Sequence, residues 1–220
     1  MMTGLARASL AAALSALALV AVACNIVTPA VYLLDGPPKT PAAFILPDLP
    51  TVAFVDDRKN ILPRFDLRGT IGDETSRVLL EKKVVQKTFS SRELLNLVRK
   101  QDTDKDLMPM DAIGRAAGAD QIIYIRIVTW QLTPDGYTPR PVAGADVRVI
   151  DCVNRTRIFP TGAEESRYVE ATTGEVSTEL YGSNATRRKL EDLLAKQLGL
   201  EIAKLFYEHE TKELGGQLRM

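Results

Sequence analysis

The chain has 220 residues, of which 45% are hydrophobic and 25% are charged. This length is enough for one ordinary domain plus an export segment, and the composition is globular, which excludes a disordered or fibrous protein. Lys plus Arg and Asp plus Glu number 28 each, so the charge excludes a global field that would favour nucleic acid or an acidic partner.

Residues 1–23 have the pattern of a cleaved export signal. Arg7 supplies a positive charge, and an unbroken run dominated by Ala and Leu follows from Ala8 to Ala23. As a helix, this run would measure about 24 Å, which is short of the ~30 Å hydrocarbon core of a bilayer. The sequence therefore predicts a signal peptide over 1–23 rather than a transmembrane helix, and its removal would leave a net charge of −1.

The apolar run ends in Ala21-Val22-Ala23-Cys24, which resembles the lipobox of bacterial prolipoproteins. The resemblance implies that the Cys24 thiol receives a lipid, with palmitate as a fatty acyl chain, and that this lipid anchors the protein in a membrane. Ala21 departs from the leucine that is usual at its place, and the alternative is ordinary signal cleavage with Cys24 incidental. Asn25 follows the cysteine, and by resemblance to enterobacterial sorting it favours the outer membrane over the inner membrane.

Residues 25–50 are rich in proline. Proline fixes φ and removes a hydrogen-bond donor, so this stretch is not expected to form a helix. We predict a lipidated cysteine and a proline-rich tether over 24–50, which holds the following domain away from the membrane. The tether contains six of the twelve prolines of the chain: Pro29, Pro37, Pro38, Pro41, Pro47 and Pro50.

Hydrophobic periodicity then predicts a soluble domain over 51–208, in which strands alternate with helices. Gly118 is placed to end a short helix in the left-handed conformation. In chain order, the first half is expected to contain a strand at 51–55, a helix starting at Thr70, a strand at 84–89, a helix from Ser91, a polar loop at 101–108 and a helix at 110–117.

The second half is predicted to add three strands and one long helix. The strands are expected at 121–130, 145–153 and 167–172, and the helix follows a cap at Ser183 or Asn184. The predicted fold class is therefore α/β (α+β), a single mixed β-sheet with packing helices and a long amphipathic C-terminal helix, followed by a polar tail at 209–220. The apolar face of that helix is expected to contain Leu190, Leu193, Leu194, Leu198, Ile202, Leu205 and Phe206.

No metal or cofactor site is expected. The acidic run 102–106 resembles the start of a calcium-binding loop, but Leu107 stands where that loop needs glycine and Ile113 where it needs glutamate. The glycine-rich run 114–120 follows a helix and precedes a strand, which is the reverse of a phosphate-binding loop. His209, the only histidine, is expected near the end of the last helix, so a His-based metal site cannot be assembled.

The chain is expected not to be an enzyme. With a single peripheral histidine, a Ser-His-Asp triad cannot be assembled. Hydrolysis by carboxylates alone is the alternative, because five aspartates are expected near strand ends: Asp56, Asp57, Asp120, Asp146 and Asp151.

Two further features each have a structural and a functional interpretation. Cys152 is expected to be a small buried hydrophobe, with a reactive thiol as the alternative, and it has no intramolecular partner if Cys24 is acylated. The cluster Arg187-Arg188-Lys189 is expected on a solvated face, with a headgroup or partner contact as the alternative.

The run Ala-Ile-Gly-Arg-Ala-Ala-Gly-Ala-Asp at 112–120 leads into Gln-Ile-Ile-Tyr at 121–124, after a helix containing 94–98 and the pair Val84-Val85. This order resembles a group of bacterial envelope proteins that includes the curli-secretion lipoprotein CsgG, the penicillin-binding-protein activator LpoB and the amino-terminal domain of TolB. The resemblance implies a compact domain used as a binding module rather than as a catalyst. It does not extend to the long hairpins of the curli channel, because prolines and glycines interrupt residues 131–182.

Together these observations predict a lipid-anchored, non-catalytic adaptor in the cell envelope. It would face the periplasm, with the outer membrane favoured, and bind another envelope protein or itself, but no nucleic acid. The two alternatives are an oligomeric secretion or pore-assembly component of the CsgG type and an extracytoplasmic hydrolase.

Overall fold

The structure is a computed structural model that describes residues 38–101, 107–176 and 181–211, and it divides into two compact units. The smaller unit contains residues 38–40 and 210–211 of the described part. Its strand β1 (Lys39–Thr40) pairs with β8 (His209–Glu210). The backbone N–H of Thr211 donates to the carbonyl of Pro38 over 2.8 Å, and the hydroxyls of Thr40 and Thr211 lie 2.8 Å apart.

The larger unit, from Pro41 to His209, is built on one mixed β-sheet. Strand β2 is parallel to both of its neighbours, β3 and β4, whereas β5 is antiparallel to β4, β6 and β7. The sheet order is β3-β2-β4-β5-β6, with β7 paired to the other end of β5. These strands are β2 (Thr51–Asp56), β3 (Thr88–Phe89), β4 (Gln121–Gln131), β5 (Val142–Asp151), β6 (Thr156–Phe159) and β7 (Arg167–Thr172).

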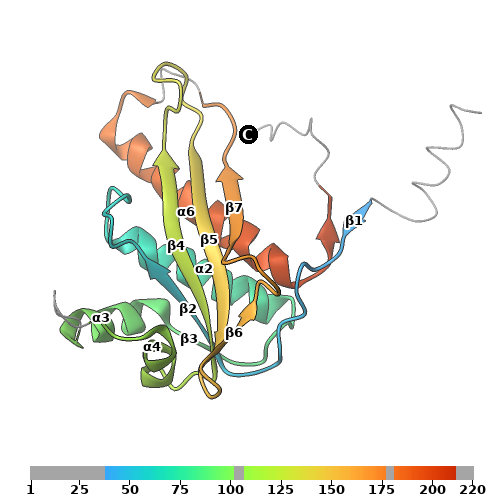
Figure 1. The fold of residues 1–220 in the computed structure, drawn as a ribbon. Helices are drawn as coiled ribbons and strands as arrows, with labels where there is room; N and C mark the ends of the chain where they lie inside the picture. Colours follow the sequence, from blue (N-terminus) through green and yellow to red (C-terminus); the bar gives the residue numbers. More distant parts are fainter. Residues whose placement is uncertain (1–37, 102–106, 177–180, 212–220) are drawn as a thin grey trace, which may run out of the picture. The chain divides into compact units, whose positions relative to one another are not determined.

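Helices cover both faces of this sheet (Figure 1). The helices α2 (Asp66–Glu81) and α6 (Asn184–Ala203) pack together on one face, and α3 (Ser91–Gln101) and α4 (Met110–Ala116) pack on the other. Alternate residues of β2 enter the two cores, since Val55 packs with α2 and α6 while Phe54 packs with α3 and α4. The mixed-sheet α+β class and the long C-terminal helix are thus confirmed.

The two helices on the first face approach each other closely at Gly199. A Cβ atom at this position would lie 2.7 Å from the backbone oxygen of Ile71, so only glycine fits without a shift. The hydroxyl of Thr75 lies between the helices, 2.9 Å from the oxygen of Ile71 and 3.2 Å from that of Gly199. This contact fixes α6 against α2 and thereby the position of the N-terminal turn of α2.

The start of α2 and the second strand differ from the prediction. Helix α2 begins at Asp66 rather than Thr70, and the Thr70 hydroxyl donates to the carbonyl of Asp66 within the helix. The carboxylate of Asp73 accepts the N–H of Ser91 over 3.2 Å and does not take part in a helix cap. The strand expected at 84–89 is reduced to Thr88–Phe89, because Val84 still belongs to the helix end. Its N–H donates to the oxygen of Leu79 over 2.9 Å, around Lys83 with a left-handed φ of 55°.

The folded unit includes ten residues that were expected in the tether. Leu46 is only 4% exposed and lies in the main core, and the ring of Phe44 lies 5.3 Å from that of Phe159. The carbonyl of Pro50 accepts the N–H groups of Asp120 and Gln121. Prolines lack an N–H but keep a carbonyl, so this stretch can lie along the domain without forming a strand.

At the other end of the domain, Ser183 caps α6 as predicted, because its hydroxyl accepts the N–H of Thr186 over 3.0 Å. The helix ends at Ala203 and continues as a 3-10 turn (Lys204–Phe206). Among the described residues, none of the helices combines the length and apolar character needed to cross a membrane.

Candidate functional site

A cleft of about 380 Å³ lies at the C-terminal end of β2. The neighbouring strand β3 ends beside Val52, so the second half of β2 has no strand on that side. Helix α3 lies there instead, and the first turn of α2 lies opposite. The cleft is lined by Phe54, Asp56, Arg58, Asn60, Phe65, Arg68, Leu95, Val98 and Arg99.

The topology explains why a cleft forms at this point. The connection that leaves β2 runs through α2 on one face of the sheet, whereas the connection that leaves β3 runs through α3 and α4 on the other face (Figure 1). The strand order reverses at β2, because the chain passes from β2 to β3 on one side and then across to β4 on the other. In open α/β sheets, ligands bind beyond the carboxyl ends of the strands at such a reversal.

The lining is strongly basic. Its three guanidinium groups, from Arg58, Arg68 and Arg99, face a single lining carboxylate, that of Asp56, which gives a net formal charge of +2. Within the described residues, Arg68 and Arg99 make no ion pair, and the Nε of Arg58 lies 3.6 Å from Asp56. A cleft with this charge favours an anionic ligand.

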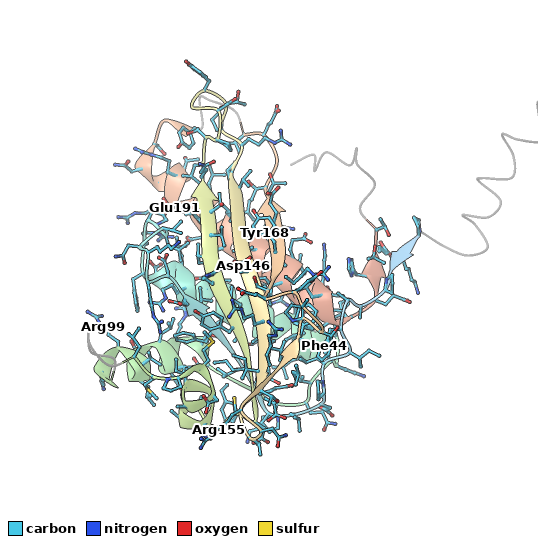
Figure 2. The ribbon with its side chains drawn as sticks, in the orientation of Figure 1. Phe44, Arg99, Asp146, Arg155, Tyr168 and Glu191 are labelled. Atoms are coloured by element: carbon cyan, nitrogen blue, oxygen red, sulfur yellow. The ribbon has the colours of Figure 1, made fainter. Side chains whose placement is uncertain are left out.

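Aromatic rings hold two of these guanidinium groups. The Arg68 guanidinium lies 5.3 Å from the centre of the Phe65 ring and 5.9 Å from that of Phe54, and Arg99 lies 5.6 Å from Phe65. Figure 2 shows Arg99 at the far end of α3. The Nε of Arg68 also donates to the oxygen of Val55 over 2.8 Å, so Arg68 is fixed at the strand end. These contacts leave the terminal nitrogens of both arginines for other partners.

The two aspartates at the end of β2 have structural hydrogen bonds. Asp56 accepts the hydroxyl of the buried Tyr124 and the N–H of Arg58. Asp57 accepts the N–H groups of Ile61 and Leu62, over 2.8 and 3.0 Å, and so shapes the turn that leads to α2. Both carboxylates are less than a tenth exposed.

Burial alters the acidity of two groups here. Desolvation lowers the pKa of the Arg68 guanidinium from its usual value, although Asp56 and Asp57 act in the opposite direction. Burial, with the hydrogen bond to Asp56, raises the pKa of the Tyr124 hydroxyl. At neutral pH the arginine is still charged, so the cleft holds a partly desolvated cation that an oxyanion would stabilise.

The other three aspartates considered for hydrolysis do not lie in one site with Asp56 and Asp57. Asp146 is level with Asp56 across the sheet but pairs with Arg126 over 2.5 Å. Asp120 and Asp151 lie at the opposite end of β2, and Asp151 accepts two backbone N–H groups and the amide of Asn154. Those hydrogen bonds lower the pKa of Asp151. The structure therefore separates the five candidates.

Several features singled out in the sequence do not line the cleft. Cys24 and the acidic run 102–106 fall outside the described residues, and in the part that is described no group of three or more His, Cys, Asp and Glu could hold a metal ion. His209 is not in the last helix, because the chain is extended at this point, and its Nδ1 lies 3.1 Å from the oxygen of Tyr207. Arg187, Arg188 and Lys189 are exposed at the start of α6.

Residues 112–124 pack helix α4 tightly against the sheet. Gly118 has a left-handed φ of 76°, as predicted, and its N–H donates to Arg115 at the end of α4. A Cβ atom at Gly114 would lie 2.2 Å from the Sγ of Cys152. Cys152 is fully buried beneath α4. The glycine-rich run thus brings α4 close to the sheet.

We expect the Cys152 thiol to be unreactive in the folded protein. Burial raises its pKa to about 11, so at pH 8 only about one thiol in a thousand would be ionised, and the thiolate is the nucleophile. In native protein at pH 8, iodoacetamide should leave the Cys152 peptide unmodified, whereas in 6 M guanidinium it should be fully labelled. Rapid native labelling, measured by peptide mass spectrometry, would contradict this packing.

No protein-family model and no curated protein matches the chain. Solved structures whose chains follow a similar path include the PelC dodecamer from Paraburkholderia phytofirmans. It matches at 13% identity and a TM-score of 0.39, covering 77% of this chain and 96% of that one. Lipoprotein GNA1162 from Neisseria meningitidis matches at 13% identity and 0.39, covering 70% and 98%. The hypothetical protein CT253 from Chlamydia trachomatis matches at 19% and 0.38, covering 71% and 91%. Likenesses this distant carry no argument about function, and the resemblance to CsgG, LpoB and TolB stays a prediction.

Proposed function

We propose that the protein is a lipid-anchored, non-catalytic adaptor of the cell envelope. The observation that carries the proposal is the sequence Ala21-Val22-Ala23-Cys24 at the end of a short apolar run. A lipid on Cys24 would hold the chain at a bilayer, with the outer membrane favoured by Asn25 and the domain facing the periplasm.

The domain boundary supports this arrangement. The larger unit begins at Pro41, so residues 24–40 separate the anchor from it. Seventeen residues span at most about 55–60 Å when fully extended. The folded domain could therefore meet a partner well away from the headgroups while its lipid remains in the membrane.

The geometry of the polar groups supports a binding role over hydrolysis. Asp56, Asp57, Asp146 and Asp151 each have structural hydrogen bonds or ion pairs. The only histidine contacts Tyr207 and does not face any of them. The charged groups left available in the cleft are guanidiniums, which bind and orient anions but do not transfer protons at neutral pH.

Replacement of Cys24 by alanine should move the protein from the membrane fraction to the soluble fraction. The physical reason is that anchoring depends on the buried acyl chains. The measurement is fractionation of intact envelopes, with mass spectrometry of the mature N-terminal peptide and crosslinking to identify partners. Sucrose-gradient density separates outer from inner membrane.

Cys152→Ala is the matched control, because it removes the other cysteine of the chain. It should leave both the membrane fraction and the crosslinked partners unchanged. If Cys24→Ala stays in the membrane with the same partners, or if the mature peptide shows a free thiol, the anchored adaptor is wrong.

A further inference from the structure

The cleft at the end of β2 is the strongest unassigned feature of the described residues. The cleft has a volume of about 380 Å³ and a net positive charge along its lining. It also lies at the carboxyl end of a strand where the strand order of the sheet reverses, which is where open α/β sheets bind ligands. None of these observations involves Cys24, so what the cleft binds can be examined separately from the anchor.

The polar side of the cleft matches an oxyanion. Guanidinium groups donate two parallel hydrogen bonds to a carboxylate or phosphate, and such charge-assisted bonds are among the strongest in proteins. Arg68 and Arg99 come from two different helices, and their guanidiniums lie 5.3 and 5.6 Å from the centre of the same Phe65 ring, so the two groups are at most about 11 Å apart. Asp56 is occupied by Tyr124 and Arg58 and offers little competition.

The apolar side of the cleft limits the ligand further. Phe54, Leu95 and Val98 are buried and form its floor, while the Phe65 ring is 49% exposed at its rim. An exposed aromatic ring beside buried apolar side chains favours a ligand with an apolar or aromatic group. A small hydrated ion would leave this side of the cleft without a partner.

We propose that this cleft binds a ligand that presents an oxyanion, a carboxylate or a phosphate, next to an apolar group. The oxyanion lies between the Arg68 and Arg99 guanidiniums, with Arg58 at the opening, and the apolar group lies against Phe65. The C-terminal carboxylate of a peptide and a phosphate ester both have this chemistry.

The test is titration of the full-length chain in detergent, followed by ligand-detected NMR. The carboxylate probe is N-acetylphenylalanine, compared with its neutral amide, and the phosphate probe is phenyl phosphate, compared with inorganic phosphate. Dissociation constants on the order of 1 mM are expected for probes this small. Preference for N-acetylphenylalanine indicates a peptide terminus, and preference for phenyl phosphate indicates a phosphate ester.

The informative variant is Arg99→Gln, because Arg99 is exposed and its one described contact is the Phe65 ring. Removal of one charge-assisted contact should weaken binding about fivefold or more. The matched control is Arg77→Gln on α2, whose side chain is also exposed but pairs with Glu74 and Glu81. It should change binding less than about twofold.

Two results would overturn the proposal. One is wild-type protein that binds neither oxyanion probe more tightly than the neutral amide. The other is an equal loss in Arg99→Gln and Arg77→Gln, which would show a diffuse field instead of a built site. Neither result bears on whether Cys24→Ala leaves the membrane, so the two proposals fail separately.

Discussion

Leu198→Ala is expected to lower the free energy of unfolding by about 2–5 kcal/mol. Leu198 is fully buried on α6, in the core that this helix forms with α2 and the sheet. The substitution removes buried methyl groups and leaves a cavity that neighbouring side chains cannot close, because Gly199 already holds the two helices in contact. Urea unfolding, followed by circular dichroism and by the fluorescence of Trp130, the single tryptophan, measures the loss.

The matched control is Leu193→Ala on the same helix. The chemical change is identical, but the Leu193 side chain is 44% exposed. We expect a loss below about 1 kcal/mol, because an exposed position leaves no cavity. Equal losses at the two positions would mean that α6 does not present this face to the sheet.

The same two leucines show how far periodicity predicts a helix. The pattern placed both on one apolar face, and the structure buries Leu190, Leu194, Leu198 and Ile202 but not Leu193. The buried set follows a spacing of four, along which side chains stack on one stripe. Leu193 lies one residue, or about 100°, before Leu194, so it faces the edge of that stripe. Sequence alone could not set the width of the contact, because the neighbouring α2 determines it.

Strand β6 is absent from the prediction, and β3 is shorter than the strand predicted at 84–89, for a related reason. Thr156–Phe159 contains two polar residues in four, and only its pairing with β5 makes it a strand. Val84 and Val85 have strong strand propensity, yet the helix end at Lys83 takes them out of the sheet. In both places, tertiary contacts outweigh the local preference.

The cleft could be anticipated only in part. The aspartates at the end of β2 were recognised, but as candidate acids, whereas the structure assigns them to hold Tyr124 and the turn. The arginines come from three separate segments, and no spacing within the sequence joins Arg68 to Arg99. One usable signal is Phe65 with Arg68 three residues later, at the start of the helix that follows β2, since i and i+3 share one helix face.

Asp57→Ala is expected to lower the free energy of unfolding by about 2–4 kcal/mol and to weaken oxyanion binding in the cleft as well. The carboxylate accepts two backbone N–H groups, of which that of Leu62 is buried and that of Ile61 is partly buried, so alanine would leave both donors without an acceptor. The turn that these bonds hold also carries Arg58 and Asn60 to the cleft. Asp57→Asn, which keeps one acceptor oxygen, should lose about half as much.

Asp48→Ala is the control, because it removes an aspartate that also accepts two hydrogen bonds but is exposed to solvent. Both hydrogen bonds come from Gln86, and water can replace the carboxylate. We expect a loss below about 1 kcal/mol and unchanged binding of the probes. If Asp57→Ala were as stable as Asp48→Ala, the turn would not depend on its buried carboxylate. The arginine cleft would then have to be held by the contacts of Arg68 with Val55 and Phe65 alone.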